Sequence, residues 1–289
     1  MQALIITAYK NENRLIHLLE SAHEYFNIYL HIDNKSDISV KRICKQFPDI
    51  YCIKRYPVYW GSFNHLLAVM DLLRVAFEDQ NQYFHIVSGE DIIVKPLEEF
   101  NHFENETLIY IDFIKMTAVS DIIRDRLKYW IFSSNIANGN PHSLLRNRFV
   151  RKAQKVFHLE RNKIASIETV YKGLIWASMP RDAVEYVIRY TEEHSDFMRA
   201  MKHTHVPEEF FFQSILGNSP LKDRIIEDNL RYADWNARNG SCPAYLDDTD
   251  FDKIIKSDKI FARKIDDVIS AGLLCKLEEA EVIKKSVFE

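Results

Sequence analysis

Two short segments of this chain carry charges that could together drive a group transfer. Phe261-Ala262-Arg263-Lys264 sets a guanidinium beside an ammonium, and Pro207-Glu208-Glu209 sets two carboxylates upstream of them. Adjacent cations can stabilise a phosphate that leaves with negative charge, because Arg offers a planar fork of donors and Lys a compact charge. A carboxylate can accept the proton of an attacking hydroxyl. The two segments therefore predict displacement of a nucleotide diphosphate from a sugar by a hydroxyl.

Length and composition favour one continuous domain over residues 1–289. The chain is 47% hydrophobic, and its 7 Gly and 8 Pro are scattered singly, without a linker. The formal net charge is −4, so nucleic acid is not an expected partner. The sequence has no basic leader, no apolar run of about eighteen residues and no CxxC pair among its four cysteines, which predicts a cytoplasmic protein with reduced thiols.

Short apolar runs alternate with helical patterns in the first half and predict crossover units around a mostly parallel sheet. The expected strands are 4–7, 28–32, 50–53, 83–87 and 107–111. Asp33, Asp91 and Asp112 follow three of these strands at or just past the carboxyl end, where open α/β sheets bind ligands. Each Asp alone is equally well explained as a turn former or a helix cap.

The second half continues with a strand expected over 173–178 and helices expected over 181–193 and 209–216. Glu208 and Glu209 are then expected in the first turn of the later helix, where the helix dipole favours ionised carboxylates.

The stretch 144–163 is strongly basic, unlike the chain as a whole. It contains seven Lys or Arg residues and one acid, with apolar residues such as Phe149 and Phe157 interleaved. Two interpretations stay open: a solvated helix face, or a peripheral contact with the inner face of a membrane or with an anionic acceptor.

Seven short motifs resemble the core-2/I-branching β-1,6-N-acetylglucosaminyltransferase family, which also contains peptide O-xylosyltransferases. The motifs lie at 6–11, 31–36, 59–62, 88–91, 207–211, 230–236 and 261–266. Each is weak alone, but seven in the family's order and at compatible spacing are specific. The stretch 115–170 is covered least. The lack of an anchor, a stem and disulfides resembles a bacterial-type member.

The resemblance implies an α/β fold of the GT-A type, with a Rossmann-like mixed sheet flanked by helices. Residues 1–112 would form the nucleotide-binding half and 113–289 the acceptor and catalytic half. It further implies inverting transfer of a sugar, most simply GlcNAc, from a UDP-sugar to a hydroxyl of a glycan or lipid-linked glycan in polysaccharide assembly. The product would be β-linked.

No metal or other cofactor is expected. Most GT-A enzymes hold a metal through a DxD sequence at a strand end, but the matching stretch here is Ser88-Gly89-Glu90-Asp91. The literal DxD strings, 248–250 and 250–252, fall in a polar segment elsewhere.

The family match assigns Glu209 as general base, Lys264 as first ligand of the diphosphate and Arg263 as second. The other expected contacts with the nucleotide sugar are Thr7, Ala8, Asp33, Trp60 and Asp91. The expected acceptor or sugar contacts are Asp112, Trp176, Glu208 and Trp235.

Two alternatives stay open. Xylosyl transfer from UDP-xylose is favoured by the likeness of 230–236 and the 261 segment to the xylosyltransferase branch. That branch has an Asp before the aromatic residue that Trp176 matches, whereas this chain has Ile175 there. A non-catalytic sugar-nucleotide or glycan-binding protein of the same fold is the other alternative, and the presence of Glu209 argues against it.

Overall fold

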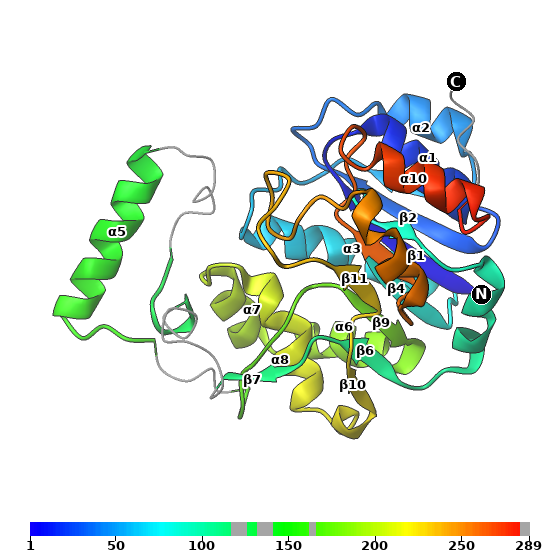
Figure 1. Cartoon of the computed structure of the whole chain (residues 1–289). Coiled ribbons are helices and arrows are strands. Elements are labelled where there is room, and N and C mark those ends of the chain that lie inside the picture. The colour runs from blue at the N-terminus through cyan, green and yellow to red at the C-terminus, as the bar shows by residue number, and fades with distance from the viewer. Residues whose placement is uncertain (117–125, 132–140, 162–165, 284–289) are drawn as a thin grey trace.

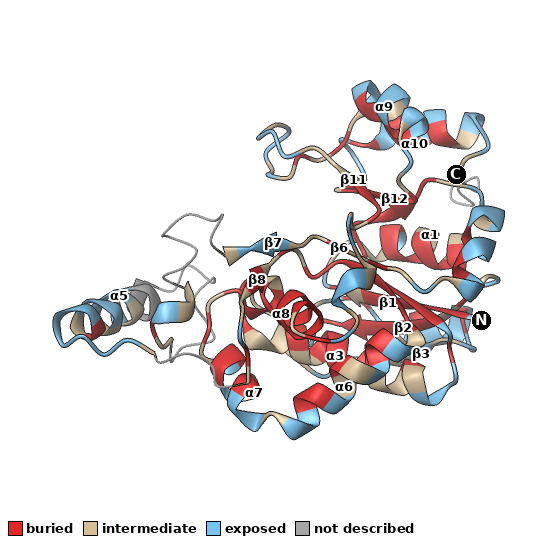
Figure 2. Cartoon of the chain, turned by 90° about the horizontal axis from the view of Figure 1, so that it is seen from below, coloured by how far each residue is buried: buried red, intermediate tan, exposed pale blue. Residues whose placement is uncertain are grey.

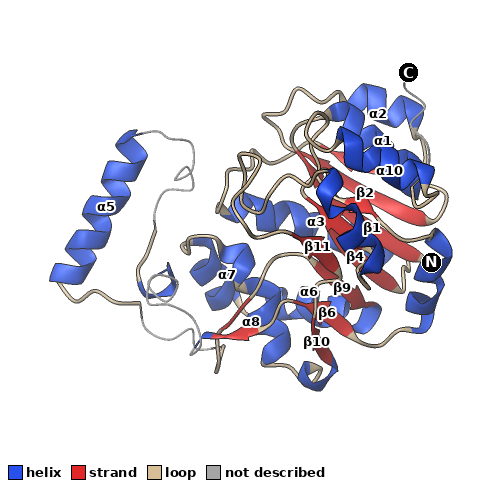
Figure 3. Ribbon diagram, viewed as in Figure 1, coloured by secondary structure: helices blue, strands red, loops and turns tan. Residues whose placement is uncertain are grey.

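The computed structural model describes residues 1–116, 126–131, 141–161 and 166–283 (Figure 1). A seven-stranded sheet lies at the centre of these residues, in the order β10-β6-β9-β4-β1-β2-β3 (Figure 3). Its strands are β1 (Gln2–Ala8), β2 (Phe26–Ile32), β3 (Tyr51–Ile53), β4 (Tyr83–Ser88), β6 (Ile109–Ile111), β9 (Ala177–Pro180) and β10 (Ile225–Glu227). Only β9 among them runs antiparallel to its neighbours, β4 and β6, so the sheet is mixed.

Helices cover both faces of this sheet. Those of the described residues are α1 (Glu12–Ala22), α2 (Val40–Gln46), α3 (Phe63–Glu78), α5 (Pro141–Val156), α6 (Arg181–Glu193), α7 (Ser195–Lys202), α8 (Phe211–Gly217), α9 (Phe251–Lys256) and α10 (Ala271–Glu279). Successive side chains of a strand point to opposite faces. Ile5 of β1 therefore packs in the core with α3, α6 and α8, whereas Leu4 and Ile6 pack with α1 and α2. Figure 2 shows α1 on one face of the sheet and α3 and α6 on the other. No helix within the described ranges has both the length and the apolar character needed to cross a membrane.

A three-stranded sheet contains the cationic segment 261–263 and positions it next to the main sheet. Its order is β11-β12-β5, with β5 (Ile92–Ile93), β11 (Arg231–Ala233) and β12 (Phe261–Arg263). Strand β5 comes shortly after β4, and β12 pairs with it antiparallel. Residues 261–263 are thereby fixed beside the carboxyl end of β4. A further pair joins β7 (Ile114–Lys115) to β8 (Tyr171–Lys172).

The predicted α/β fold with a mixed, helix-flanked sheet is confirmed, and all five strands expected in the first half are present with shifted ends. The strand expected over 173–178 begins only at Ala177. The helix expected over 209–216 was wrong at its start. Glu208 and Glu209 lie in a separate 3₁₀ turn, Pro207–Glu209, because Phe210 has a φ of −122° that interrupts the helical path before α8.

The basic stretch is divided in the structure. Its cations from Arg146 to Lys155 lie on α5, whereas Arg161 is turned into the protein. The Arg161 guanidinium donates to the carbonyls of Leu127 and Ala200, each at 2.7 Å, so it is not part of a basic surface. Lys163 lies outside the described residues.

Candidate active site

The carboxyl ends of β1, β2 and β4 form one edge of the sheet, and predicted residues gather there. Thr7 is in register with Ser88 of β4. Backbone hydrogen bonds tie the following loops to β1, since the N–H of Asp33 donates to the carbonyl of Ala8 (2.8 Å) and that of Gly89 to the carbonyl of Thr7 (3.0 Å). The parallel strands thus bring Thr7, Ala8 and Asp33 together.

Asp33 is held in place by a cation that the sequence analysis did not single out. The backbone N–H of Lys35 donates to Asp33 Oδ1 (2.9 Å), and the Lys35 ammonium lies 2.6 Å from Oδ2. The same ammonium lies 4.3 Å from the centre of the Tyr59 ring. Asp33 is buried, so its carboxylate is an oriented acceptor beside a fixed positive charge.

Arg263 lies buried between Asp91 and Trp176. Its Nε is 3.6 Å from Asp91 Oδ1, and its guanidinium carbon is 4.3 Å from the centre of the Trp176 indole. Nε and Nη1 of Arg263 have no hydrogen-bond partner within the described part of the chain. A buried guanidinium with unmet donors is suited to receive an anion, because unpaired buried donors are destabilising.

Asp91 is fully buried, and its Oδ2 accepts the backbone N–H of Ser88 at 2.5 Å. In this arrangement the carboxylate orients the loop after β4 and faces Arg263. Its predicted contact with the nucleotide sugar stays a prediction.

Arg231 is a second buried guanidinium, which the sequence analysis placed in a motif without a role. Its Cζ lies 5.3 Å from the centre of the Trp176 ring and 5.0 Å from that of Phe261. It donates to the carbonyls of Asn229 (2.8 Å) and Ile86. Burial lowers the pKa of Arg231 to about 10. Trp176 therefore contacts two guanidinium groups, and cation–π contacts help to position both.

Lys264 and Lys10 approach the same aromatic ring. Lys264 Nζ lies 5.5 Å from the centre of the Tyr245 ring and 3.5 Å from Ser241 Oγ. Lys10 Nζ lies 2.9 Å from Tyr245 Oη and 2.9 Å from Glu90 Oε1. Burial alone would lower the pKa of Lys10, but hydrogen bonds to Tyr245 and Glu90 outweigh it and raise that pKa above its ordinary value. The site thus contains a further ammonium that stays charged.

Glu209 is bound by two cations from other segments. Arg126 Nη1 donates to Glu209 Oε2 at 2.9 Å, and Lys172 Nζ lies 3.2 Å from the same oxygen. The carbonyl of Glu209 accepts the N–H of Gly173 at 2.8 Å. Two cations and one backbone N–H thus fix the position of Glu209 in the turn.

Glu208 is connected to the sheet edge by His65, which contacts both Glu208 and Thr7. Its Oε1 lies 3.7 Å from His65 Nδ1, and His65 Nε2 shares a 3.3 Å hydrogen bond with Thr7 Oγ1. The His65 ring also meets Trp176 edge-on at 6.3 Å. Oε2 of Glu208 is buried and has no hydrogen-bond partner among the described residues. The sequence analysis did not predict His65 as a site residue. Its position three residues after the motif 59–62 is the sequence feature that could have indicated it.

Three other predicted residues have different surroundings. Both carboxylate oxygens of Asp112 accept from Asn229 Nδ2, at 2.9 and 3.0 Å, so Asp112 supports the fold at the end of β6. Trp60 is 65% exposed and meets the ring of His205 edge-on at 5.3 Å. Trp235 is 56% exposed. Two indole faces are therefore available to a ligand, and the predicted roles of all three residues stay predictions.

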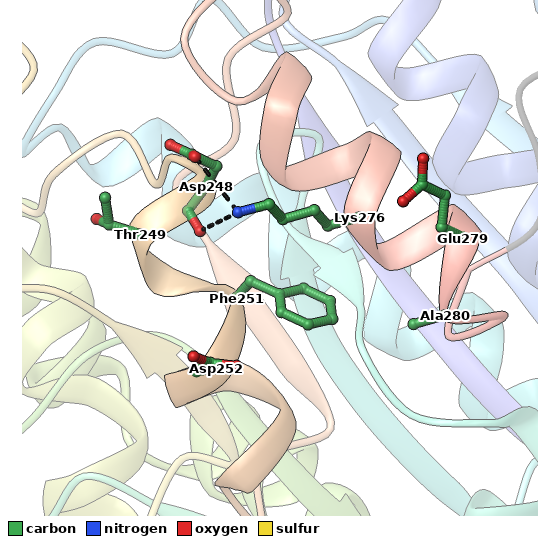
Figure 4. Close-up of a pocket in the computed structure, with 7 residues that line it drawn as sticks. All are labelled: Asp248, Thr249, Phe251, Asp252, Lys276, Glu279 and Ala280. Carbon is green, nitrogen blue, oxygen red and sulfur yellow. Dashed lines mark hydrogen bonds and ion pairs between the residues drawn. The ribbon is translucent and has the colours of Figure 1, made fainter.

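The literal DxD strings lie in a different place from this edge. The Asp250 carboxylate is fully buried and is bound by Arg238 and by Tyr232 Oη. Asp248 lies in a surface cavity of about 650 Å³, where Lys276 Nζ is 3.3 Å from its Oδ2 (Figure 4). The cavity is lined by Asp248, Thr249, Phe251, Asp252, Lys276, Glu279 and Ala280. In the described ranges no group of three or more His, Cys, Asp or Glu is arranged to hold a metal.

The mixed sheet flanked by helices, with fixed cations at its carboxyl edge and a carboxylate segment beside them, is an α/β fold of the GT-A type. The family model described as Core-2/I-Branching enzyme matches residues 3–254, and the chain belongs to this family. The predicted family is thereby confirmed.

Known relatives share low but extended similarity with this chain. The chain is 20% identical to Xylosyltransferase oxt of Drosophila pseudoobscura pseudoobscura over 297 aligned residues. That alignment covers 94% of this chain and 32% of the relative. The chain is 25% identical to Xylosyltransferase 2 of Canis lupus familiaris over 238 aligned residues, and this alignment covers 75% of this chain and 24% of the relative. The chain therefore spans about a quarter to a third of the length of these relatives.

Solved structures show only weak likeness. The crystal structure of 4-diphosphocytidyl-2C-methyl-D-erythritol synthase has a TM-score of 0.34 and 10% identity, over 68% of this chain and 84% of that one. The crystal structure of S. aureus TarS has a TM-score of 0.29 and 14% identity, over 47% of this chain and 44% of that one.

Proposed function

We propose that this chain is an inverting, metal-independent glycosyltransferase that moves a sugar from a UDP-sugar to a hydroxyl of a glycan acceptor. The observation that carries the proposal is the buried Arg263 guanidinium, whose Nε and Nη1 lack partners among the described residues while Asp91 and Trp176 hold its plane. Such a group is complementary to the negative charge that develops on a departing diphosphate.

Lys264 and Lys10 support the same role for this edge of the sheet. Together with Arg263 they supply three fixed positive charges, and the Arg side chain can bind two phosphate oxygens at once. As the bond between the anomeric carbon and the diphosphate breaks, its electron pair moves to a β-phosphate oxygen. The cations would stabilise that oxygen in the role that a divalent metal fills in other transferases.

Glu209 is the proposed general base. It would accept the proton of the acceptor hydroxyl as the hydroxyl oxygen attacks the anomeric carbon from the side opposite UDP. One displacement of this kind inverts the configuration and gives a β-linked product from an α-linked donor. Arg126 and Lys172 support the assignment, since they hold the carboxylate in place before the acceptor binds.

The donor sugar is proposed to be GlcNAc, with xylose as the second candidate. The names of the relatives favour UDP-xylose, whereas Ile175 stands where the xylosyltransferase branch has an Asp. The proposed acceptor is a glycan or a lipid-linked glycan. The four free thiols support a reducing, cytoplasmic setting.

Titration of the protein with UDP tests the central assignment. Arg263→Gln should weaken UDP binding at least about tenfold, because a charge-assisted bidentate contact is lost. Arg189→Gln, on the exposed side of α6, is the matched control and should bind UDP normally. Arg263→Gln also leaves the buried Asp91 carboxylate without its cation. The double variant Arg263→Gln/Asp91→Asn removes that carboxylate, so it tests whether the loss of UDP affinity comes from Arg263 itself.

The same titration with UDP-GlcNAc and UDP-xylose identifies the donor, and nuclear magnetic resonance of the product reports the anomeric configuration. Transfer should persist in EDTA. Loss of transfer on chelation with recovery in Mn²⁺ would contradict metal independence. UDP binding without turnover of any donor or acceptor would favour the non-catalytic alternative.

A further inference from the structure

Helix α5, Pro141–Val156, stands apart from the α/β body and belongs to none of the proposed donor contacts (Figures 1 and 2). Large apolar side chains are exposed on it and just after it. Leu145, Phe149, Val156, Phe157 and Leu159 are each 60–74% exposed. Exposed apolar residues gathered on one element mark an interaction surface more often than scattered ones do.

The face of α5 opposite these exposed apolar side chains is attached to the rest of the protein. Gln154 is buried, and its side chain exchanges two hydrogen bonds of 2.9 Å with the backbone N–H and carbonyl of Trp130. The next residue, Ile131, is hydrogen-bonded through its backbone to His203 at 3.0 Å. The segment 130–131 therefore links α5 to the helical side of the body.

Helical geometry places the apolar residues away from that attachment. At about 100° per residue, Leu145, Phe149 and Val156 fall within about 40° of one another and on the side opposite Gln154. Phe157 and Leu159 extend the apolar surface beyond the end of the helix.

Cations border this apolar stripe. The helix contains Arg146, Arg148, Arg151, Lys152 and Lys155 and no Asp or Glu, within a chain of net charge −4. By the same geometry Lys152 lies at one edge of the stripe, and Arg148 and Arg146 lie on its two sides. A basic helix with Phe and Leu along one face is the pattern of helices that lie in the interface of an anionic bilayer.

We propose that α5 and the residues up to Leu159 dock on an anionic phospholipid surface, with the stripe of Leu145, Phe149 and Val156 facing the acyl chains. A soluble polyanion would use the cations but gain nothing from the exposed apolar side chains. A symmetric second copy would bring the same cations against one another, because an isologous interface repeats one patch on both sides. A negatively charged bilayer satisfies both features. The inference does not depend on the transfer reaction.

Vesicle flotation tests this proposal with the whole chain. The protein should float with vesicles of equal parts phosphatidylcholine and phosphatidylglycerol and should not float with phosphatidylcholine alone. Phe149→Ser should weaken partition at least about tenfold, because a buried aromatic side chain is lost. Val268→Ser is the matched control, since Val268 is 84% exposed in another region.

A variant that removes two positive charges from α5 separates the electrostatic contribution to vesicle binding from the apolar one. Arg148→Gln/Lys152→Gln should also weaken partition about tenfold or more, whereas Lys41→Gln/Lys45→Gln removes the same charge from α2 and should have little effect. All four variants should bind UDP normally, so failure here is distinguishable from failure of the proposed transfer site.

Three results would overturn the proposal. One is equal flotation with neutral and anionic vesicles, and another is flotation that Phe149→Ser does not weaken. The third is absence of flotation together with heparin binding or self-association in sedimentation, which would assign the surface to a polyanion or to a second copy.

Discussion

One carboxylate oxygen of Glu209, Oε2, contacts both Arg126 and Lys172, so the side chain is held in place before an acceptor arrives. The two cations come from segments that are distant in sequence from each other and from Glu209. An acceptor hydroxyl would have to approach this carboxylate beside its present partners. The reactivity of Glu209 is therefore set by neighbours that its own motif does not contain.

Glu209→Gln should lower kcat on the order of 10²- to 10⁴-fold, because the amide cannot take a proton from the acceptor. UDP affinity should stay unchanged, which calorimetry can check. Glu193→Gln, an exposed acid on α6, serves as the control. Normal turnover in Glu209→Gln would reject the base assignment.

His65 is a positioning residue in the same region, since it joins Thr7 at the sheet edge to Glu208 beside the base. His65→Phe keeps a ring near Trp176 but removes both nitrogens, and we expect about a tenfold loss in kcat. His65→Gln should recover part of that loss, because its amide can bond on one side. Undiminished kcat in His65→Phe would indicate that the ring only fills space.

At the scale of elements, the end of β6 lies close to the segment after β8, and this contact determines the position of Glu209, the proposed base. A Cβ at Gly173 would lie 2.1 Å from the carbonyl oxygen of Asp112, so only glycine fits there. The Gly173 N–H also holds the carbonyl of Glu209. One residue thus couples the end of β6 to the turn that carries both carboxylates.

Gly173→Ala should destabilise the protein by about 1–3 kcal/mol, since backbone must move to relieve the overlap. Urea unfolding measures the change, and turnover should fall with it because Glu209 shifts. Gly272→Ala, in α10, is the control, since a Cβ there would lie 3.4 Å from Asp248 Cβ, which is an ordinary contact. Unchanged stability of Gly173→Ala would show that the close approach is absent in solution.

For the whole molecule, buried imidazoles link stability to pH. His85 lies in the centre of the sheet, with Nδ1 2.8 Å from Ser178 Oγ and Nε2 3.0 Å from Gln2 Oε1. Burial lowers the pKa of His85 to about 3 and that of His31 to about 4. The folded chain keeps both rings neutral where the unfolded chain binds protons.

The free energy of unfolding should therefore be fully retained above about pH 6.5 and should fall as pH drops below it. Each imidazole contributes a slope of up to about 1.4 kcal/mol per pH unit. Urea unfolding between about pH 7 and pH 5.5 measures the slope. His31→Gln and His85→Gln should each flatten it, whereas exposed His23→Gln should not; a slope unaltered in both buried variants would contradict the assignment.

The sequence by itself determined the class of fold and the central motifs. Runs such as 4–7 and 28–32 are apolar on both faces, which is typical of parallel strands buried between helices. Because parallel strands end at one edge of a sheet, the position of Asp33 at that edge follows from the chain order alone. Motif order likewise predicted Glu209 and Arg263 as site residues, because short motifs keep their residues adjacent in the chain.

Only the tertiary structure decided which residues surround those motifs. Arg126, Lys172, His65 and Arg231 carry no local pattern that predicts their neighbours, since long-range packing alone brings them to Glu209, Thr7 and Trp176. Long-range packing likewise set the interruption of the helical path before α8 and the burial of Asp91. Periodicity reports which face of an element is buried, whereas the partner that covers this face is set by the fold as a whole.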